Sequence, residues 1–188
     1  MIRFNNVSFA YTDVPVLENL SFSCGDAEVV WLSGANGSGK TTIIKLALSL
    51  VKPLSGTVDT PSPTSAVFQE DRLCDHLTAV ANIRLGLGRR ASNQEILAQL
   101  SQAGVSPKDA VRPVSQLSGG QRRRVCLTRA LGRDSALLCL DEPYTGIDDA
   151  SLDDIIDYTL ARIGRRPVLL VCHDAAVAAR FSPIEVRI

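Results

Sequence analysis

Runs of hydrophobic residues alternate with helical patterns along most of the chain. Three runs, at residues 29–32, 136–140 and 168–172, are hydrophobic at consecutive positions. Strands in the middle of a parallel sheet are covered on both faces, so they carry hydrophobic residues at every position. We therefore predict an α/β domain in which these three runs are neighbouring strands of a mainly parallel sheet.

The beginning of the chain follows a different pattern, because hydrophobic and polar residues alternate there with a period of about two. The alternating hydrophobic residues are Ile2, Phe4, Val7, Phe9, Leu20, Phe22 and Cys24. This period is typical of half-buried antiparallel strands. We expect a small antiparallel β-layer at the N-terminus.

Two regions carry clear helical signals. Hydrophobic residues at helical spacing cover 152–163, and Gly164 follows them. Between residues 73 and 116 the strand pattern disappears, and Ser92 with Glu95 forms a capping box that begins a helix. This second region is predicted to be a helical insertion.

The composition of the chain argues against a nucleic-acid-binding protein and against a membrane-spanning one. The 188 residues are 45% hydrophobic, and 20 Lys and Arg side chains balance 20 Asp and Glu side chains. Proteins that bind nucleic acid usually carry a basic excess, so we expect no nucleic-acid partner. The longest hydrophobic runs have five residues, whereas a membrane-spanning helix needs about 20. The N-terminal residues lack a secretory signal and the five cysteines form no metal-ligand spacing, so we expect a cytoplasmic chain with structural thiols.

A glycine-rich segment follows the run 29–32 directly and matches the phosphate-loop pattern G-x-x-x-x-G-K-[ST]. Its residues are Gly34, Ala35, Asn36, Gly37, Ser38, Gly39, Lys40 and Thr41, with Thr42 next in the following helix. Glycines let successive N–H groups point at an anion at a helix N-terminus. Lys40 would reach the β- and γ-phosphates, and the Thr41 hydroxyl would bind Mg²⁺. The segment therefore predicts binding of a nucleoside triphosphate.

Two carboxylates, Asp141 and Glu142, come directly after the run 136–140. The carboxyl ends of parallel strands form the edge of the sheet where ligands collect. Asp141 can hold Mg²⁺ through water, and Glu142 can orient and deprotonate an attacking water. Either carboxylate could instead cap the next turn, because Pro143 follows.

The segment 117–121, Leu-Ser-Gly-Gly-Gln, begins another helical pattern. Ser118 and Gln121 form a capping box, which alone would explain a helix start. The box does not explain Gly119 and Gly120, each of which costs about 1 kcal/mol relative to alanine in a helix. A helix N-terminus without side chains is a second anion site, and a head-to-tail dimer would place it over the γ-phosphate bound by the partner.

These segments together resemble the ATP-binding cassette (ABC) ATPase family. The resemblance rests on 34–42, Gln69, 117–121, 137–142 and His173, in this order and spacing. It implies one domain over 1–188, with a P-loop NTPase core of mainly parallel sheet, an N-terminal antiparallel β-layer and an inserted helical subdomain. In this scheme 1–72 and 117–188 form the core with the β-layer, and 73–116 forms the helical subdomain.

The resemblance also implies residue roles. Tyr11 would stack on adenine, Gln69 would sense Mg²⁺ and the γ-phosphate, Asp148 would cross the dimer interface, and His173 would hold the γ-phosphate. The implied catalytic residues are Glu142, His173 and Gln69. The implied nucleotide-binding residues are Tyr11, Gly34, Asn36, Gly37, Ser38, Gly39, Lys40, Thr41, Thr42, Ser118, Gly119, Gly120, Gln121 and Asp148. The implied metal-binding residues are Thr41, Gln69 and Asp141.

Simpler interpretations exist for several of these residues. Tyr11 could be an ordinary edge aromatic, Asp148 could cap the helix that follows it, and His173 could be a structural histidine. Residues 122–124, three consecutive arginines, are most often a solvated helix face, although they could add positive potential near the phosphates. His76 is expected on the surface.

The implied function is that of an ATP- and Mg²⁺-dependent ABC transporter ATPase. It would dimerise around two ATP molecules and sit on the inner face of the membrane through separate permease subunits. Residues 68–73, 77–79 and 82–83 resemble the importer ATPases for nitrate, sulfonates and taurine, so import is expected. An exporter ATPase or a soluble non-transport ABC ATPase is the alternative. A kinase has no use for 117–121, and the 78 positions between Lys40 and Ser118 leave no room for the coiled coil of chromosome-organising ATPases.

Overall fold

The computed structural model describes residues 1–87 and 91–188 and divides into two compact units. The first unit comprises Met1–Thr64, Ser135–Asp141 and Arg165–Ile188, and the second comprises Ser65–Asp134 and Glu142–Gly164. The predicted helical subdomain, 73–116, falls within the second unit, apart from 88–90, which lie outside the described residues. The finer division into core and subdomain stays a prediction.

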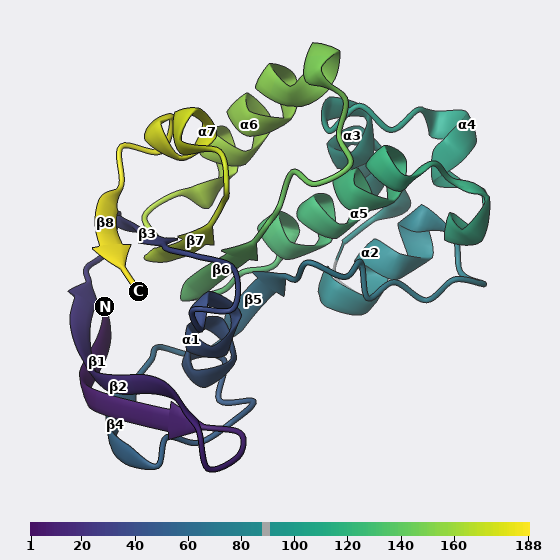
Figure 1. Cartoon of the computed structure of the whole chain (residues 1–188). Coiled ribbons are helices and arrows are strands. Elements are labelled where there is room, and N and C mark those ends of the chain that lie inside the picture. The colour runs from purple at the N-terminus through teal and green to yellow at the C-terminus, as the bar shows by residue number, and fades with distance from the viewer. Residues whose placement is uncertain (88–90) are drawn as a thin grey trace. The chain divides into compact units, whose positions relative to one another are not determined.

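The N-terminal β-layer is confirmed. Its antiparallel strands β1 (Ile2–Ala10), β2 (Pro15–Cys24) and β4 (Ser55–Asp59) lie in the order β2-β1-β4 (Figure 1). A bulge at Asn6, with φ of 47°, shifts the register between Phe4 and Val7. The bulge adds one residue to β1 and so changes which side the following side chains face. Ile2 and Phe4 before the bulge and Val7 and Phe9 after it therefore face the same side, and all four are buried.

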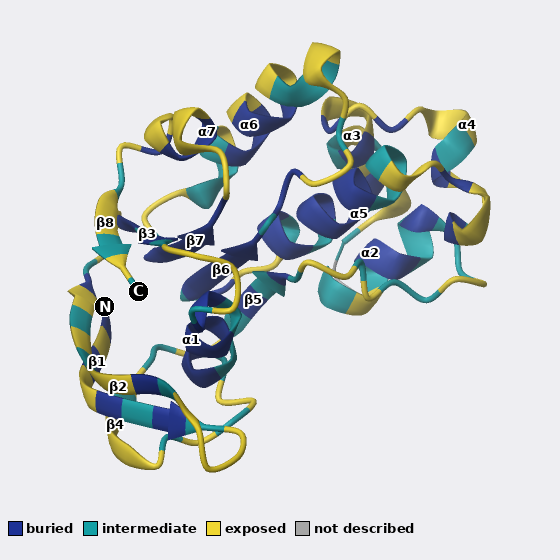
Figure 2. Cartoon of the chain, viewed as in Figure 1, coloured by how far each residue is buried: buried dark blue, intermediate teal, exposed yellow. Residues whose placement is uncertain are grey.

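The three predicted central strands are neighbours in a parallel arrangement. In the first unit β6 (Leu137–Asp141), β7 (Val168–Val171), β3 (Val29–Ser33) and β8 (Ile184–Arg187) follow one another in that order. β6 and β7 are buried along their whole length (Figure 2). The same unit contains helices α1 (Lys40–Ala47) and α7 (Ala175–Ala179), and α1 contacts β6 and β7. The segments that follow β3, β6 and β7 therefore emerge at one edge of the sheet.

The second unit is mainly helical. Its elements are β5 (Thr64–Val67), α2 (Ala79–Leu87), α3 (Asn93–Gln102), α4 (Pro107–Ala110), the 3₁₀ turn η2 (Val114–Gln116), α5 (Gly119–Gly132) and α6 (Asp149–Ile163). The first residue of β5, Thr64, still belongs to the first unit. Ser92 and Glu95 form the predicted capping box of α3. A core of buried side chains from α2, α3, α4 and α5 includes Ile83, Ile96, Leu100 and Val125.

Among the described residues, no helix has the length and hydrophobicity needed to span a bilayer. All five cysteines are free thiols, and four of them are buried. Burial raises the pKa of Cys24 to about 11 and that of Cys126 to about 12. Thiols with such values are poor nucleophiles, which agrees with the predicted structural role.

Gly56 is expected to be essential for the β-layer. Its φ is +80°, and a Cβ would lie 2.3 Å from the Asn6 carbonyl oxygen at the bulge. Gly56→Ala should lower the free energy of unfolding by more than the about 1–3 kcal/mol of a strained backbone alone. Gly164→Ala is the matched control, because Gly164 also has positive φ but a Cβ there meets nothing within 4 Å. Equal losses for the two variants in urea unfolding would contradict the steric explanation.

Candidate active site

The glycine-rich loop between β3 and α1 needs its glycines for different reasons. Gly34, Gly37 and Gly39 all have positive φ. A Cβ on Gly34 would lie 2.5 Å from the Ile188 carbonyl oxygen, and one on Gly39 would lie 2.8 Å from Leu17 Cδ2. A Cβ on Gly37 would meet nothing within 4 Å, so this glycine is required by its backbone conformation. Close packing at both ends thus fixes the loop against the rest of the first unit.

The start of α1 offers the donors that an anion requires. Gly39 occupies the N-cap position and provides no side-chain cap, so the first N–H groups of α1 have no partner within the helix. The Lys40 side chain is buried, and its Nζ donates to the Gly34 and Ala35 carbonyl oxygens at 2.9 and 2.7 Å. Ser38 Oγ is also buried, and none of the described residues hydrogen-bonds to it. The loop therefore combines N–H donors, a cation and a hydroxyl in a cradle that fits a phosphate.

Tyr11 lies beside the first two turns of α1. Its hydroxyl is 3.3 Å from Thr42 Oγ1 and accepts a hydrogen bond from Lys45 Nζ at 3.2 Å. Partial burial raises the pKa of Tyr11, but the hydrogen bonds with Thr42 and Lys45 and the Lys45 charge outweigh it, so this pKa is lowered. The ring packs edge-on against Phe9 and is 54% exposed. An aromatic surface next to the phosphate loop suits a nucleotide base.

His173 follows β7 at the carboxyl edge of the sheet. The residue before it is fixed because Trp31 Nε1 in β3 donates to the Cys172 carbonyl oxygen at 3.0 Å. The residue after it, Asp174, caps α7 by accepting from the Ala176 and Val177 N–H groups. The His173 side chain is exposed between these two fixed points. Trp31 is a supporting residue that the sequence reasoning missed, because its strand position signalled only burial.

Asp141 and Glu142 differ in their surroundings. Asp141 ends β6 and is almost fully buried, whereas Glu142 is half-buried. Glu142 has φ of 48°, a conformation that non-glycine residues rarely adopt. The turn after it is closed by a backbone hydrogen bond from Ile147 to Tyr144 at 3.1 Å. Such backbone strain is found preferentially at functional sites.

The oxygen donors of the first unit suit Mg²⁺. Thr41 supplies a hydroxyl at the start of α1 and Asp141 supplies a buried carboxylate. The described residues include no cluster of three or more His, Cys, Asp or Glu side chains that could hold a metal. Mg²⁺ does not need such a cluster, because it is usually bound by one or two protein oxygens together with phosphate and water.

The segment 117–121 forms the predicted helix start. Ser118 Oγ accepts from the Gln121 N–H at 3.2 Å, and Gln121 Oε1 accepts from the Ser118 N–H at 3.0 Å. A Cβ on Gly120 would lie 3.0 Å from the Gly146 carbonyl oxygen, so packing within the unit accounts for this glycine. A Cβ on Gly119 would meet nothing within 4 Å. No contact within the described chain explains the absence of a side chain at Gly119.

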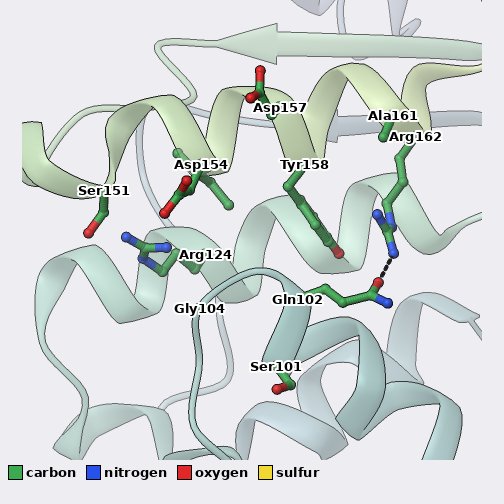
Figure 3. A pocket seen from close by; sticks show the side chains of 11 residues that line it. Ser101, Gln102, Gly104, Arg124, Ser151, Asp154, Asp157, Tyr158, Ala161 and Arg162 are labelled. Atoms are coloured by element: carbon green, nitrogen blue, oxygen red, sulfur yellow. Dashed lines mark hydrogen bonds between the residues drawn. The ribbon is translucent and has the colours of Figure 1, made fainter.

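Asp148 occupies the N-cap position of α6 but makes no side-chain cap, so the capping interpretation is wrong. Ser151 Oγ donates to Asp148 Oδ1 at 2.8 Å, and this hydrogen bond holds the Asp148 pKa below its usual value. Arg124 Nη2 lies 4.0 Å from the same carboxylate. Figure 3 shows Arg124 reaching from α5 toward α6 in the wall of a cavity of about 750 Å³.

The expectation of a solvated face for the three consecutive arginines is also wrong. The Arg123 and Arg124 side chains are buried, with 3% and 8% of each residue exposed. Arg122 pairs with Asp71 and Asp75, each at 3.0 Å. Buried guanidinium groups are tolerated because their N–H groups donate to carbonyl and carboxylate oxygens. His76, by contrast, is exposed as expected.

The structure places the predicted residues in two groups. The first unit holds Tyr11, the loop with Lys40, Thr41 and Thr42, Asp141 and His173. The second unit holds Gln69, the segment 117–121, Glu142 and Asp148. The Gln69 side chain is exposed, while Arg123 donates to its backbone carbonyl oxygen.

Comparison with known proteins agrees with this geometry. The family described as "ABC transporter" matches residues 17–145, which covers the phosphate loop, the segment 117–121 and both carboxylates. This chain belongs to the ABC transporter family. The family and the α/β P-loop fold predicted from the sequence are therefore confirmed, and the chain is an ATP-binding ATPase.

Individual relatives are moderately similar over most of their length. The thiamine import ATP-binding protein ThiQ of Mesorhizobium japonicum is 34% identical, covering 96% of this chain and 78% of that protein. The aliphatic sulfonates import ATP-binding protein SsuB 1 of Nocardia farcinica is 36% identical, covering 92% and 71%. A dimeric post-hydrolysis structure of the ATP-binding cassette MJ0796 bound to ADP and Pi has a TM-score of 0.88 and 26% identity, covering 100% of this chain and 94% of that one.

Lys40→Ala should abolish ATP turnover. The variant removes the buried ammonium group from the phosphate cradle while the glycine packing that fixes the loop remains. Steady-state phosphate release with Mg²⁺ measures the effect, and Lys52→Ala, which changes an exposed lysine, is the control. Near-native turnover by Lys40→Ala would show that the nucleotide site has been assigned wrongly.

Tyr11→Ala should raise the ATP concentration required for half-maximal turnover and change the maximal rate less. Stacking of a base on an aromatic ring contributes about 1–3 kcal/mol, and it does not involve the reacting phosphate. Tyr11→Phe keeps the ring but loses the hydroxyl that bonds with Thr42 and Lys45, so it should retain most of the affinity. Titration with a fluorescent ATP analogue measures the affinity of both variants. Unchanged affinity in Tyr11→Ala would support the simpler interpretation that Tyr11 is an ordinary edge aromatic.

Proposed function

We propose that this chain is the ATP-hydrolysing subunit of an ABC importer, working as a homodimer that encloses two ATP molecules. It would drive separate permease subunits from the inner face of the membrane. The observation that carries the dimer is Gly119, whose missing side chain has no explanation within the described chain. The names of the relatives, which concern thiamine and sulfonate import, support import as the direction.

Two incomplete anion sites favour a head-to-tail dimer. The loop 34–39 offers N–H groups and Lys40 to one side of a triphosphate. The N-terminus of α5 offers the exposed Ser118 and Gly119. A symmetric dimer in which each α5 N-terminus covers the partner's γ-phosphate uses both sites at once. Dimeric structures among the solved neighbours support this arrangement.

Hydrolysis then follows from the roles of individual side chains. Lys40 and the N–H groups at the start of α1 bind the β- and γ-phosphates. Thr41, Asp141 and Gln69 would hold Mg²⁺, which when bound neutralises charge on the phosphate oxygens. Glu142 orients the attacking water and accepts its proton. His173 donates a hydrogen bond to a γ-phosphate oxygen and maintains the geometry around Glu142.

Glu142→Gln tests both the catalytic role and the dimer. The amide keeps size and hydrogen bonding but cannot accept the proton, so turnover should fall about 10²–10⁴-fold. ATP then persists between the protomers. Light scattering should show a monomer without nucleotide and a dimer with saturating ATP. A variant that stays monomeric at saturating ATP and high protein concentration would contradict the proposed dimer of the isolated subunit.

The dimer geometry is tested by a second substitution in the Glu142→Gln background. Ser118→Arg would fill the space proposed for the partner's γ-phosphate and should prevent the ATP-dependent dimer. Ser92→Arg is the matched control, because Ser92 is also an exposed capping-box serine of the second unit. It should lose similar capping energy, about 1 kcal/mol, and still dimerise. A dimer indifferent to Ser118→Arg would refute the sandwich.

A further inference from the structure

One buried arginine binds two separate parts of the second unit. Arg123 Nη1 donates to the Phe68 carbonyl oxygen at 2.7 Å, and Nη2 donates to the Gln69 carbonyl oxygen at 2.5 Å. Its Nε donates to the Thr145 carbonyl oxygen at 3.4 Å, and Nη1 lies 3.8 Å from Asp71 Oδ1. The two carbonyl groups at 68 and 69 thus receive the two ends of one rigid guanidinium fork.

Two further arginines of α5 contact the same loop, and both share Asp71 with Arg123. Arg122 binds the Asp71 and Asp75 carboxylates, and Arg129 donates to the Arg72 carbonyl oxygen at 3.0 Å. These contacts attach residues 71–75 to α5. Of the three arginines, Arg123 is the one that reaches the backbone of Gln69 and the turn that contains Thr145.

We infer that Arg123 is a positioning residue that joins Gln69, the α5 N-terminus and the 144–148 turn into one rigid group. Arg123 lies in the second turn of α5, close to Ser118, and Thr145 is three residues before Asp148. Because the guanidinium is buried, loss of these hydrogen bonds would leave a buried charge without partners, which is costly. A displacement of Gln69 must therefore move the other two elements with it.

This inference deepens the proposed function and rests on the role proposed there for Gln69 at the γ-phosphate. Binding at Gln69 would be transmitted through Arg123 to the two elements proposed to face the partner protomer. Because Arg123 fixes the Gln69 carbonyl group, the backbone from which the Gln69 side chain extends would also be held in one orientation. Loss of Arg123 should leave ATP affinity largely intact and impair the chemical step.

Amide hydrogen exchange tests the positioning directly and does not depend on hydrolysis. In the ATP-free protein, Arg123→Ala should accelerate exchange in peptides covering 68–71 and 145–147 by about tenfold or more, because hydrogen bonds to charged groups are among the stronger ones. Arg123→Lys keeps the charge without the fork and should show the same regions loosened. Arg129→Ala is the matched control on the same helix and should leave exchange at 145–147 unchanged. Unchanged exchange in both Arg123 variants would overturn the inference.

Kinetics then connects positioning with Gln69. Arg123→Lys should lower kcat about tenfold or more with little change in the KM for ATP, and combining it with Gln69→Ala should add little to the loss from Gln69→Ala alone. Independent, multiplicative losses would overturn the inference. If Gln69→Ala alone kept full turnover, the proposed role of Gln69 would fail, and the exchange experiment would still decide whether Arg123 positions its backbone.

Discussion

The first N–H groups of a helix have no carbonyl partner within the helix, and this constraint shapes the proposed nucleotide site of the chain. At α1 the N-cap is Gly39, which offers no side chain to satisfy them. The loop before it is fixed by close packing at Gly34 and Gly39 rather than by hydrogen bonds to those donors. The donors therefore stay available, next to the buried Lys40, for a phosphate that comes from outside the chain.

The N-terminus of α5 solves the same constraint differently. Here Ser118 and Gln121 satisfy one another's backbone groups, so the helix is stable without a ligand. The arginines that follow attach α5 to the rest of the second unit. Their guanidinium groups bind carbonyl and carboxylate oxygens in place of water. α5 thus acts as a scaffold, because the loop 68–75, the end of α3 and the turn before α6 are all attached to it through guanidinium groups.

Much of this fold could be predicted from hydrophobic patterns. Residues 29–32, 136–140 and 168–172 are hydrophobic at every position, which is typical of strands covered on both faces. The phosphate loop could be predicted because its glycines, lysine and threonine each have a separate physical reason. The sequence shows the change from even to odd hydrophobic positions between Phe4 and Val7, but only the pairing with β2 shows that a bulge produces it.

The arginines mark a different limit of sequence reasoning. A charged side chain is normally solvated, and burial of Arg123 is offset by three carbonyl oxygens from residues 68, 69 and 145 that converge on it, in addition to the Asp71 carboxylate. The three carbonyl oxygens belong to the backbone, so no side-chain pattern in the sequence indicates them. Asp148 is similar, because its N-cap position predicts a cap while Ser151 and Arg124 draw its carboxylate elsewhere.

Gly119 and Gly120 are neighbouring glycines at the start of α5, but only one of them is explained by a contact within the described part of the chain. Both are unfavourable in the first turn of a helix, because glycine stabilises a helix less than alanine does. The Gly146 carbonyl oxygen explains Gly120 from within the chain, whereas Gly119 faces open space. A residue that reduces helix stability and serves no contact in its own chain is best explained by a contact outside it. The contact proposed for this helix N-terminus is the close approach of the partner's γ-phosphate, which a bare backbone would allow.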